Sequence, residues 1–173
     1  MKQRKRCALV LPVTAALVLL ADQVSKYLVV TWLGEGQSWD ITDWLAPFVR
    51  ITHVTNTGAA FGLFPQGGVF FAVVAVIVIV AIVLYYHNLP DGQCLMRVAL
   101  GLQLGGAIGN LVDRLRYKWS VVDFIDFNFW PLHNWPISNL ADVSVVAGVT
   151  LLALAMLWEE RRERGGRQMA GGS

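Results

Sequence analysis

Charged residues are scarce in this sequence. They make up 15% of the 173 residues, whereas 55% are hydrophobic, and a soluble domain typically carries about 25% charged residues. The scarcity argues against an ordinary soluble domain and favours a protein that lies in a membrane. The formal net charge of +2 is too small to indicate a nucleic-acid partner.

Metal-binding patterns are also missing. The chain has two cysteines, Cys7 and Cys94, and three scattered histidines, without the close spacings of zinc sites such as CxxC or HExxH. We therefore expect no metal and no cofactor. Both cysteines fall on the side assigned below to the cytoplasm, where thiols stay reduced. We expect them to be small buried side chains and not a disulfide.

Long apolar segments fill most of the chain. The run 67–86 holds twenty uncharged residues, which as a helix would span about 30 Å, the thickness of the hydrocarbon core. Its β-branched residues would suit a strand, but a lone strand cannot satisfy its backbone in lipid. The sequence predicts a membrane α-helical fold in a single domain, 1–160, and a disordered cytoplasmic tail, 161–173. The four transmembrane helices are expected at about 7–33, 67–86, 96–116 and 139–158.

The connection between the first two spans is polar and rich in turns. Within it, 39–55 contains β-branched stretches that are typical of strands. The segment Asn56-Thr-Gly-Ala-Ala-Phe-Gly62 then interrupts that pattern with two glycines. We expect a small folded region outside the membrane.

Basic residues indicate the orientation. Four spans place both termini on one side, and nine of the fourteen Lys and Arg residues lie in the two terminal segments and the middle turn. The positive-inside rule then puts both termini in the cytoplasm and the two long connections outside. Arg114, Arg116 and Lys118 run against the rule, which suggests a local role for at least one of them.

Three carboxylates on different spans fall at one depth. Asp22 lies 16 residues after Arg6, Asp113 lies 16 after Arg97, and Asp142 lies 17 before Glu159. At about 1.5 Å per residue, each sits roughly 24–26 Å from the inner face. The spacing predicts a polar layer just beneath the outer surface.

Other polar residues join this layer. Asn110 is one helical turn deeper than Asp113, and Lys26 is one turn further out than Asp22. The simplest interpretation of Asp22 and Lys26 is a supporting ion pair. Gly101, Gly105, Gly106 and Gly109 precede Asn110 at helical spacing, which indicates close helix packing and room beside that side chain.

The stretch from Ser120 to Asp142 carries aspartates at both ends. Asp123 can fold back to the polar layer where Asp142 lies. Two close aspartates cannot both ionise easily, so they share a proton and together can activate water and protonate a carbonyl oxygen. Asn139 has an alternative role as a helix N-cap with Asp142 at N3. On a strand Asp126 would face away from Asp123, and it is the second candidate for that role.

Five motifs in order resemble one family, the bacterial lipoprotein (type II) signal peptidases. The matching residues are Asp22-Gln-Val-Ser-Lys26, Asn56-Thr-Gly-Ala-Ala-Phe-Gly62, Gly105-Gly-Ala-Ile-Gly-Asn-Leu-Val-Asp-Arg114, Val122-Asp-Phe-Ile-Asp126 and Asn139-Leu-Ala-Asp142. Each motif is weak alone, but together they cover nearly the whole chain. One departure is Ser138, where the family often has Phe, which affects local packing and not the two aspartates.

The resemblance implies an aspartyl endopeptidase that cleaves diacylglyceryl-modified prolipoproteins just before the lipidated cysteine. It implies a catalytic pair, Asp123 and Asp142. Its substrate-binding or orienting residues would be Asn56, Asn110, Arg114 and Asn139, and its supporting polar layer Asp22, Lys26 and Asp113. The fold would add a small extracytoplasmic β-sheet cradle.

The same resemblance implies a setting and partners. The protein would be a monomer in the bacterial cytoplasmic membrane, with its active site at the outer leaflet, in contact with membrane lipid and inhibited by globomycin-type peptides.

The main alternative is a transporter or channel subunit with an intramembrane Asp/Arg/Lys layer. That alternative predicts polar residues throughout the membrane depth, and 67–86 has none. An aspartyl protease with a mid-bilayer pair is disfavoured by the depth of the aspartates.

Overall fold

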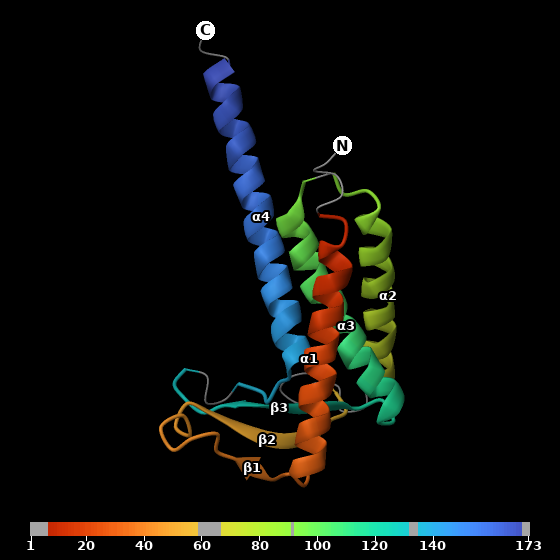
Figure 1. Cartoon of the computed structure of the whole chain (residues 1–173), viewed down its shortest axis with the longest axis vertical. Helices are drawn as coiled ribbons and strands as arrows, with labels where there is room; N and C mark the ends of the chain where they lie inside the picture. The colour runs from red at the N-terminus through yellow and green to blue at the C-terminus, as the bar shows by residue number, and fades with distance from the viewer. Residues whose placement is uncertain (1–6, 59–66, 91, 132–134, 171–173) are drawn as a thin grey trace.

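The computed structural model describes residues 7–58, 67–90, 92–131 and 135–170. Four helices and three strands lie within these residues (Figure 1). In chain order they are α1 (Val10–Trp32), β1 (Ser38–Trp39), β2 (Val49–Asn56), α2 (Gly68–Tyr86), α3 (Cys94–Arg116), β3 (Val121–Phe127) and α4 (Leu140–Ala170). The basic start of the chain, most of the glycine segment that ends at Gly62, and His133 lie outside the described residues.

The four described helices form an up-and-down bundle with the sheet across one end (Figure 1). Each contains a segment long and apolar enough to cross a membrane, ending at Trp158 in α4. Many large apolar side chains on them are exposed, such as Leu17, Phe70 and Ile77, as expected of helices that face lipid. The predicted membrane α-helical fold with a small sheet is confirmed.

Helix α3 is the centre of the bundle. In its most apolar stretch of 18 residues, half of the residues are buried. In the corresponding stretches of the other three described helices, about a fifth are buried. Its glycines permit close packing: a Cβ at Gly105 would lie 2.7 Å from the Ala15 carbonyl oxygen of α1, and one at Gly106 would lie 2.5 Å from the Ala141 carbonyl oxygen of α4. Backbones therefore pack where no side chain would fit, and this agrees with the role predicted for these glycines.

The sheet has the order β1-β2-β3 and is antiparallel. Along β2 and β3, Val54 pairs with Asp123, and Asn56 pairs with Val121. The first four residues of β3 are buried, whereas both residues of β1 are exposed and β2 has two buried residues. Of the three described strands, β3 is therefore the most deeply buried. The register of this pairing shifts between Ile51 and Val54, as in a β-bulge. A bulge adds local twist, and here it lies next to the pair formed by Val54 and Asp123.

Helix α4 continues beyond the predicted end of the fourth span. The prediction of a disordered tail from residue 161 is wrong for 161–170, because α4 is helical as far as Ala170. Charged residues with high helix propensity extend a helix once an apolar segment has nucleated it. The start of α1 and the end of α4 lie at the same end of the bundle, opposite the sheet (Figure 1).

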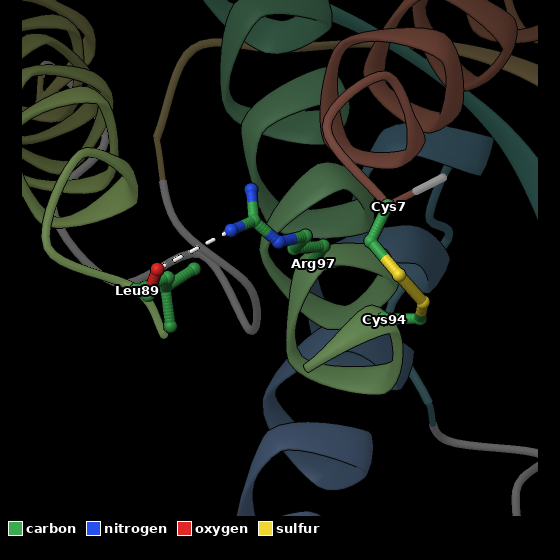
Figure 2. Close-up of a disulfide and its surroundings, with 4 residues drawn as sticks. All are labelled: Cys7, Leu89, Cys94 and Arg97. Carbon is green, nitrogen blue, oxygen red and sulfur yellow. Dashed lines mark hydrogen bonds between the residues drawn. A yellow bond between two sulfur atoms is a disulfide. The ribbon is translucent and has the colours of Figure 1, made fainter. Parts of the chain in front are cut away.

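The expectation that the cysteines are unpaired is also wrong. Figure 2 shows a disulfide between Cys7, just before α1, and Cys94, the first residue of α3; their Cα atoms are 5.3 Å apart. Nearby, Arg97 Nη2 donates a hydrogen bond of 3.3 Å to the Leu89 carbonyl oxygen. The two parallel helices begin at the same bundle end, which a sequence separation of 87 residues conceals.

Reduction of this disulfide should destabilise the bundle. Closing so long a loop removes up to about 4–5 kcal/mol of chain entropy from the unfolded state. We expect a maleimide to label neither cysteine until a reductant is added. Cys94→Ser should lower the thermal midpoint, and reductant should lower that of the wild type but not that of the variant. Full labelling of the folded, unreduced protein would contradict the disulfide.

Candidate active site

Asp123 and Asp142 line one pocket although they are 19 positions apart in the chain. Asp123 is 3% exposed on β3, and Asp142 lies in the first turn of α4. The pocket has a volume of about 660 Å³. The structure thus brings together the two aspartates that the sequence singled out.

Three asparagines bind the two carboxylates. Asn56 donates to Asp123 Oδ2 at 2.9 Å, and Asn139 donates to Asp123 Oδ1 at 2.6 Å. Asn110 donates to Asp142 Oδ1 at 2.7 Å. These bonds come from β2, from the residue before α4 and from α3, so three separate elements fix the orientation of the pair.

Asn139 has two functions at once. Its Oδ1 accepts the backbone N–H of Asp142 at 2.9 Å, the bond of a helix N-cap to residue N3. The same side chain donates to Asp123 through Nδ2. The capping interpretation of Asn139 is therefore confirmed, and the cap leaves its amide N–H group free to bind the Asp123 carboxylate.

Asp123 lies in an environment that favours its protonated form. Burial is the largest cause, and the neighbouring charge of Asp142 adds to it, so the pKa of Asp123 rises to about 7. Hydrogen bonds from Asn56 and Asn139 and the charge of Lys26 oppose the rise. A carboxyl group with this pKa exchanges protons near neutral pH, which suits acid–base chemistry.

Arg114 supplies a cation to the same pocket. Its Nη1 donates to the Asn110 carbonyl oxygen at 3.2 Å, and its guanidinium carbon lies 5.7 Å from the centre of the Phe71 ring. Among the described residues, its buried Nε has no hydrogen-bond partner. Arg114 therefore has a donor left for a ligand in the pocket.

Beneath the pocket lies a second polar cluster, formed by Asp22, Lys26 and Asp113. All three are at most 2% exposed. Lys26 Nζ is 2.9 Å from Asp22 Oδ2 and 2.9 Å from Asp113 Oδ2. The prediction that these residues share a layer with Asn110 agrees with the structure, because Lys26 Nζ also donates to Asn110 Oδ1 at 3.1 Å.

The two carboxylates of this cluster hold the backbone beside the pocket aspartates. Asp22 Oδ1 accepts the N–H of Ala141 at 2.9 Å, next to Asp142. Asp113 Oδ2 accepts the N–H of Val122 at 3.1 Å, next to Asp123. The cluster thus ties the start of α4 and the strand β3 to the same lysine.

Asp126, the second candidate for the role of Asp123, lies elsewhere. Its Oδ2 accepts a hydrogen bond of 2.9 Å from Thr52 Oγ1, and Thr52 Oγ1 is 2.9 Å from Ser38 Oγ. Asp126 pairs in register with Arg50 and is not among the residues that line the pocket. The structure therefore favours Asp123 over Asp126.

Ser138, the departure from the family pattern, lines the pocket. Its backbone N–H donates to the Ile125 carbonyl oxygen at 3.1 Å, and its own carbonyl oxygen accepts the N–H of Phe124 at 2.8 Å and that of Ile125 at 2.7 Å. Backbone bonds thus hold the residue before Asn139 against β3, whatever its side chain.

Sequence reasoning missed Gln23. Its Nε2 donates to Asp113 Oδ1 at 3.0 Å, to Asp22 Oδ2 at 3.2 Å and to the Gly109 carbonyl oxygen at 3.3 Å. Gly109 leaves room for the neighbouring Asp22 carboxylate, since a Cβ there would lie 2.5 Å from Asp22 Oδ2. Its position between Asp22 and Lys26 was the only available signal.

Comparison with known proteins places the chain in one family. A family described as signal peptidase (SPase) II matches residues 14–158. The lipoprotein signal peptidase of Moorella thermoacetica is 43% identical over 143 residues, covering 83% of this chain and 89% of that protein. The lipoprotein signal peptidase of Bacillus subtilis (strain 168) is 43% identical over 150 residues, covering 87% and 94%.

Solved structures agree with the fold. One, described as a bacterial membrane enzyme structure determined in meso at 2.3 Å resolution, superposes with a TM-score of 0.77 and 34% identity over 86% of this chain and 87% of that one. A second, described likewise at 1.9 Å resolution, has a TM-score of 0.76 and 33% identity over 91% and 97%. This chain, a multi-pass membrane protein of bacterial type, therefore belongs to the signal peptidase II family.

Proposed function

We propose that this protein is an aspartic endopeptidase that removes the signal peptide from diacylglyceryl-modified prolipoproteins, N-terminal to the lipidated cysteine. Membership of the signal peptidase II family supports the cleavage of prolipoproteins. The observation that carries the aspartic mechanism is the pair Asp123 and Asp142 in one pocket, bound by three asparagines.

In this mechanism the pair holds one proton between its two carboxyl groups. The ionised carboxylate removes a proton from a water molecule, which attacks the scissile carbonyl carbon while the protonated carboxyl donates its proton to the carbonyl oxygen. The resulting tetrahedral intermediate breaks its C–N bond when the amide nitrogen receives a proton from the pair. One hydroxyl of the intermediate returns its proton to the pair as the new carboxyl group forms. One water is consumed, and the pair returns with a single shared proton.

The asparagines and Arg114 would hold the substrate and the pair. Asn56, Asn110 and Asn139 fix the carboxylates, and a fixed geometry lowers the reorganisation needed in the transition state. The unused donor of Arg114 suits a peptide carbonyl oxygen or the developing oxyanion. In this proposal Asp22, Lys26 and Asp113 support these residues and do not contact substrate.

The apolar side of the pocket would accept the membrane-embedded part of the substrate. Phe71 of α2 and Val143, Val146 and Ala147 of α4 line it. Val146 is 63% exposed and Val143 is 45% exposed, so this wall continues onto the lipid-facing surface. A diacylglyceryl group could reach the pocket from the bilayer without crossing water, which supports membrane lipid as part of the environment of the substrate.

We propose that the sheet end of the bundle faces outward and that both termini are cytoplasmic. The distribution of basic residues supports this orientation. It places the Cys7–Cys94 disulfide at the cytoplasmic end, where thiols are ordinarily reduced. Exposed tryptophans near the sheet, among them Trp39, Trp44 and Trp130, suit a membrane–water interface. The active site would then lie at the outer leaflet. A monomer, and inhibition by globomycin-type peptides that occupy the same pocket, belong to the same proposal.

The transporter or channel alternative is not supported, because both the family match and the named relatives indicate a peptidase. The buried charges of Asp22, Lys26 and Asp113 also occur together at the sheet end. Helix α2 has no charged residue along its length. A path for ions would need polar groups throughout the membrane depth.

Replacing either pocket aspartate should abolish cleavage. Asp123→Asn and Asp142→Asn keep the size of the side chain but remove the shared proton, so kcat should fall by at least about 1,000-fold. Cleavage of a purified diacylglyceryl-modified prolipoprotein in detergent measures this effect. Asp126→Asn is the matched control on the same strand and should keep most of the activity. An active Asp123→Asn variant beside an inactive Asp126→Asn variant would overturn the assignment.

The reaction should slow as the pH rises through neutrality. The pKa of Asp123 is raised to about 7, and a carboxyl group is protonated below its pKa and ionised above it. The pair therefore keeps its shared proton below about pH 7 and loses it above that value, which removes the acid. The dependence of kcat/KM on pH should show an alkaline limb with a midpoint near 7. A rate that stays constant far above this pH would contradict the shared-proton mechanism.

A further inference from the structure

The ammonium group of Lys26 makes three contacts. Two are ion pairs of 2.9 Å with Asp22 and Asp113. The third is a hydrogen bond of 3.1 Å to Asn110 Oδ1. An ammonium group has three donors and no acceptor, so all of its capacity is used. Two carboxylates already more than balance its single positive charge, and the third contact therefore needs a separate explanation.

That third contact and a bond from Asn139 together determine which way the Asn110 amide points. Asn110 Oδ1 receives the donors of Lys26 at 3.1 Å and of Asn139 Nδ2 at 3.2 Å. The opposite orientation would place the Asn110 NH₂ group against these two donors and its oxygen against the carboxylate of Asp142. With Lys26 in place, Nδ2 must face Asp142 Oδ1, which it reaches at 2.7 Å.

The second aspartate, Asp123, also receives a hydrogen bond from an amide whose orientation is fixed, that of Asn139. Asn139 Oδ1 is occupied by the Asp142 backbone N–H, so its Nδ2 is left to donate to Asn110 Oδ1 and to Asp123 Oδ1. Both amides thus present N–H groups to the carboxylates. The helix cap fixes the Asn139 amide, and Lys26 acts together with Asn139 to fix the Asn110 amide.

We propose that Lys26 is a positioning residue for the peptidase reaction, because its ammonium group orients the Asn110 amide so that it donates to Asp142. The inference rests on the proposed function of the two aspartates. It extends the role of Lys26 beyond a supporting ion pair, since it makes the lysine responsible for the direction of a specific hydrogen bond at the reacting pair.

The charges that face the pair come from few elements. Helix α1 contributes Asp22 and Lys26, α3 contributes Asp113 and Arg114, and β3 and α4 contribute the pair itself, while α2 has no charged residue. Lys26 also lowers the pKa of Asp123 through its charge. Loss of the lysine therefore changes both the amide orientation and the electrostatics of the pair, and the experiment must separate these two effects.

The experiment compares Lys26→Met, Asp113→Asn and the double variant Lys26→Met/Asp113→Asn. Lys26→Met leaves two unopposed carboxylates, whereas the double variant restores the wild-type cluster charge of one negative unit. Asp113→Asn keeps Lys26, with an amide oxygen that can still accept the Val122 N–H. Each variant is purified, its folded fraction is measured by thermal unfolding, and kcat and KM are determined on a diacylglyceryl-modified prolipoprotein per folded molecule.

We expect the double variant, which has the cluster charge of the wild type, to remain at least about tenfold below both the wild type and Asp113→Asn in kcat, as for the loss of a hydrogen bond to a charged group. KM should change by less than about threefold, because Lys26 does not touch substrate. If the double variant matches Asp113→Asn in kcat, the orienting role of Lys26 is wrong. This comparison does not require Lys26→Met itself to fold, since the double variant keeps the charge balance.

The pH profile supplies a readout that a purely structural role would not move. Removal of a cation disfavours the ionised forms of the pair, so the limbs of the profile of Lys26→Met should shift to higher pH, whereas Lys26→Arg should keep the wild-type positions. An unchanged profile in Lys26→Met would count against the inference.

The aspartate variants separate the two proposals. The further inference alone fails if Asp123→Asn and Asp142→Asn are inactive while the double variant has the kcat of Asp113→Asn and Lys26→Met has the pH profile of the wild type. An active aspartate variant would instead remove the proposed function on which the inference rests.

Discussion

Burial of one lysine between two carboxylates, at the sheet end of an apolar bundle, is the interaction on which the site depends. Lys26 binds Asp22 and Asp113 at 2.9 Å each, and none of the three is more than 2% exposed. Breaking a buried ion pair by removing one partner typically costs about 3–5 kcal/mol, because the other charge stays uncompensated. The helices α1 and α3 are therefore held together where their polar residues lie.

This cluster also determines where the reacting groups stand. The Asp22 and Asp113 carboxylates accept backbone N–H groups at Ala141 and Val122, immediately before the two pocket aspartates in each segment. The strand and the helix that carry the pair thus meet at one buried lysine. A pocket built this way keeps its geometry although its walls face lipid, because the position of the pair does not depend on the exposed apolar side chains.

Much of this arrangement could be predicted from sequence, because helical periodicity and membrane thickness constrain where polar residues fall. The common depth of Asp22, Asp113 and Asp142 predicted the layer, and the fold-back of β3 brought Asp123 to it. The resemblance pointed to Asp123 with Asp126 as the second candidate, and the structure shows that Asp123 lines the pocket whereas Asp126 binds Thr52.

Other features could not be predicted, because they depend on contacts between elements distant in sequence. The Cys7–Cys94 bond requires knowing that α1 and α3 begin side by side. The contacts of Gln23 join α1 to Gly109 and Asp113 of α3, which lie 86 and 90 residues further along the chain. The helical continuation of α4 to Ala170 depends on an apolar segment upstream and not on the local polar composition.

The most direct test of the central claim is the protonation state of the aspartate pair in the folded protein. Infrared difference spectra recorded across pH, for the wild type and for Asp123→Asn and Asp142→Asn, report protonated carboxyl groups. A shared proton predicts one protonated carboxyl from the pair in the wild type, lost as the pH rises past about 7, and a changed signal in both variants. A wild-type protein whose two carboxyl groups are already ionised well below neutral pH would contradict the account.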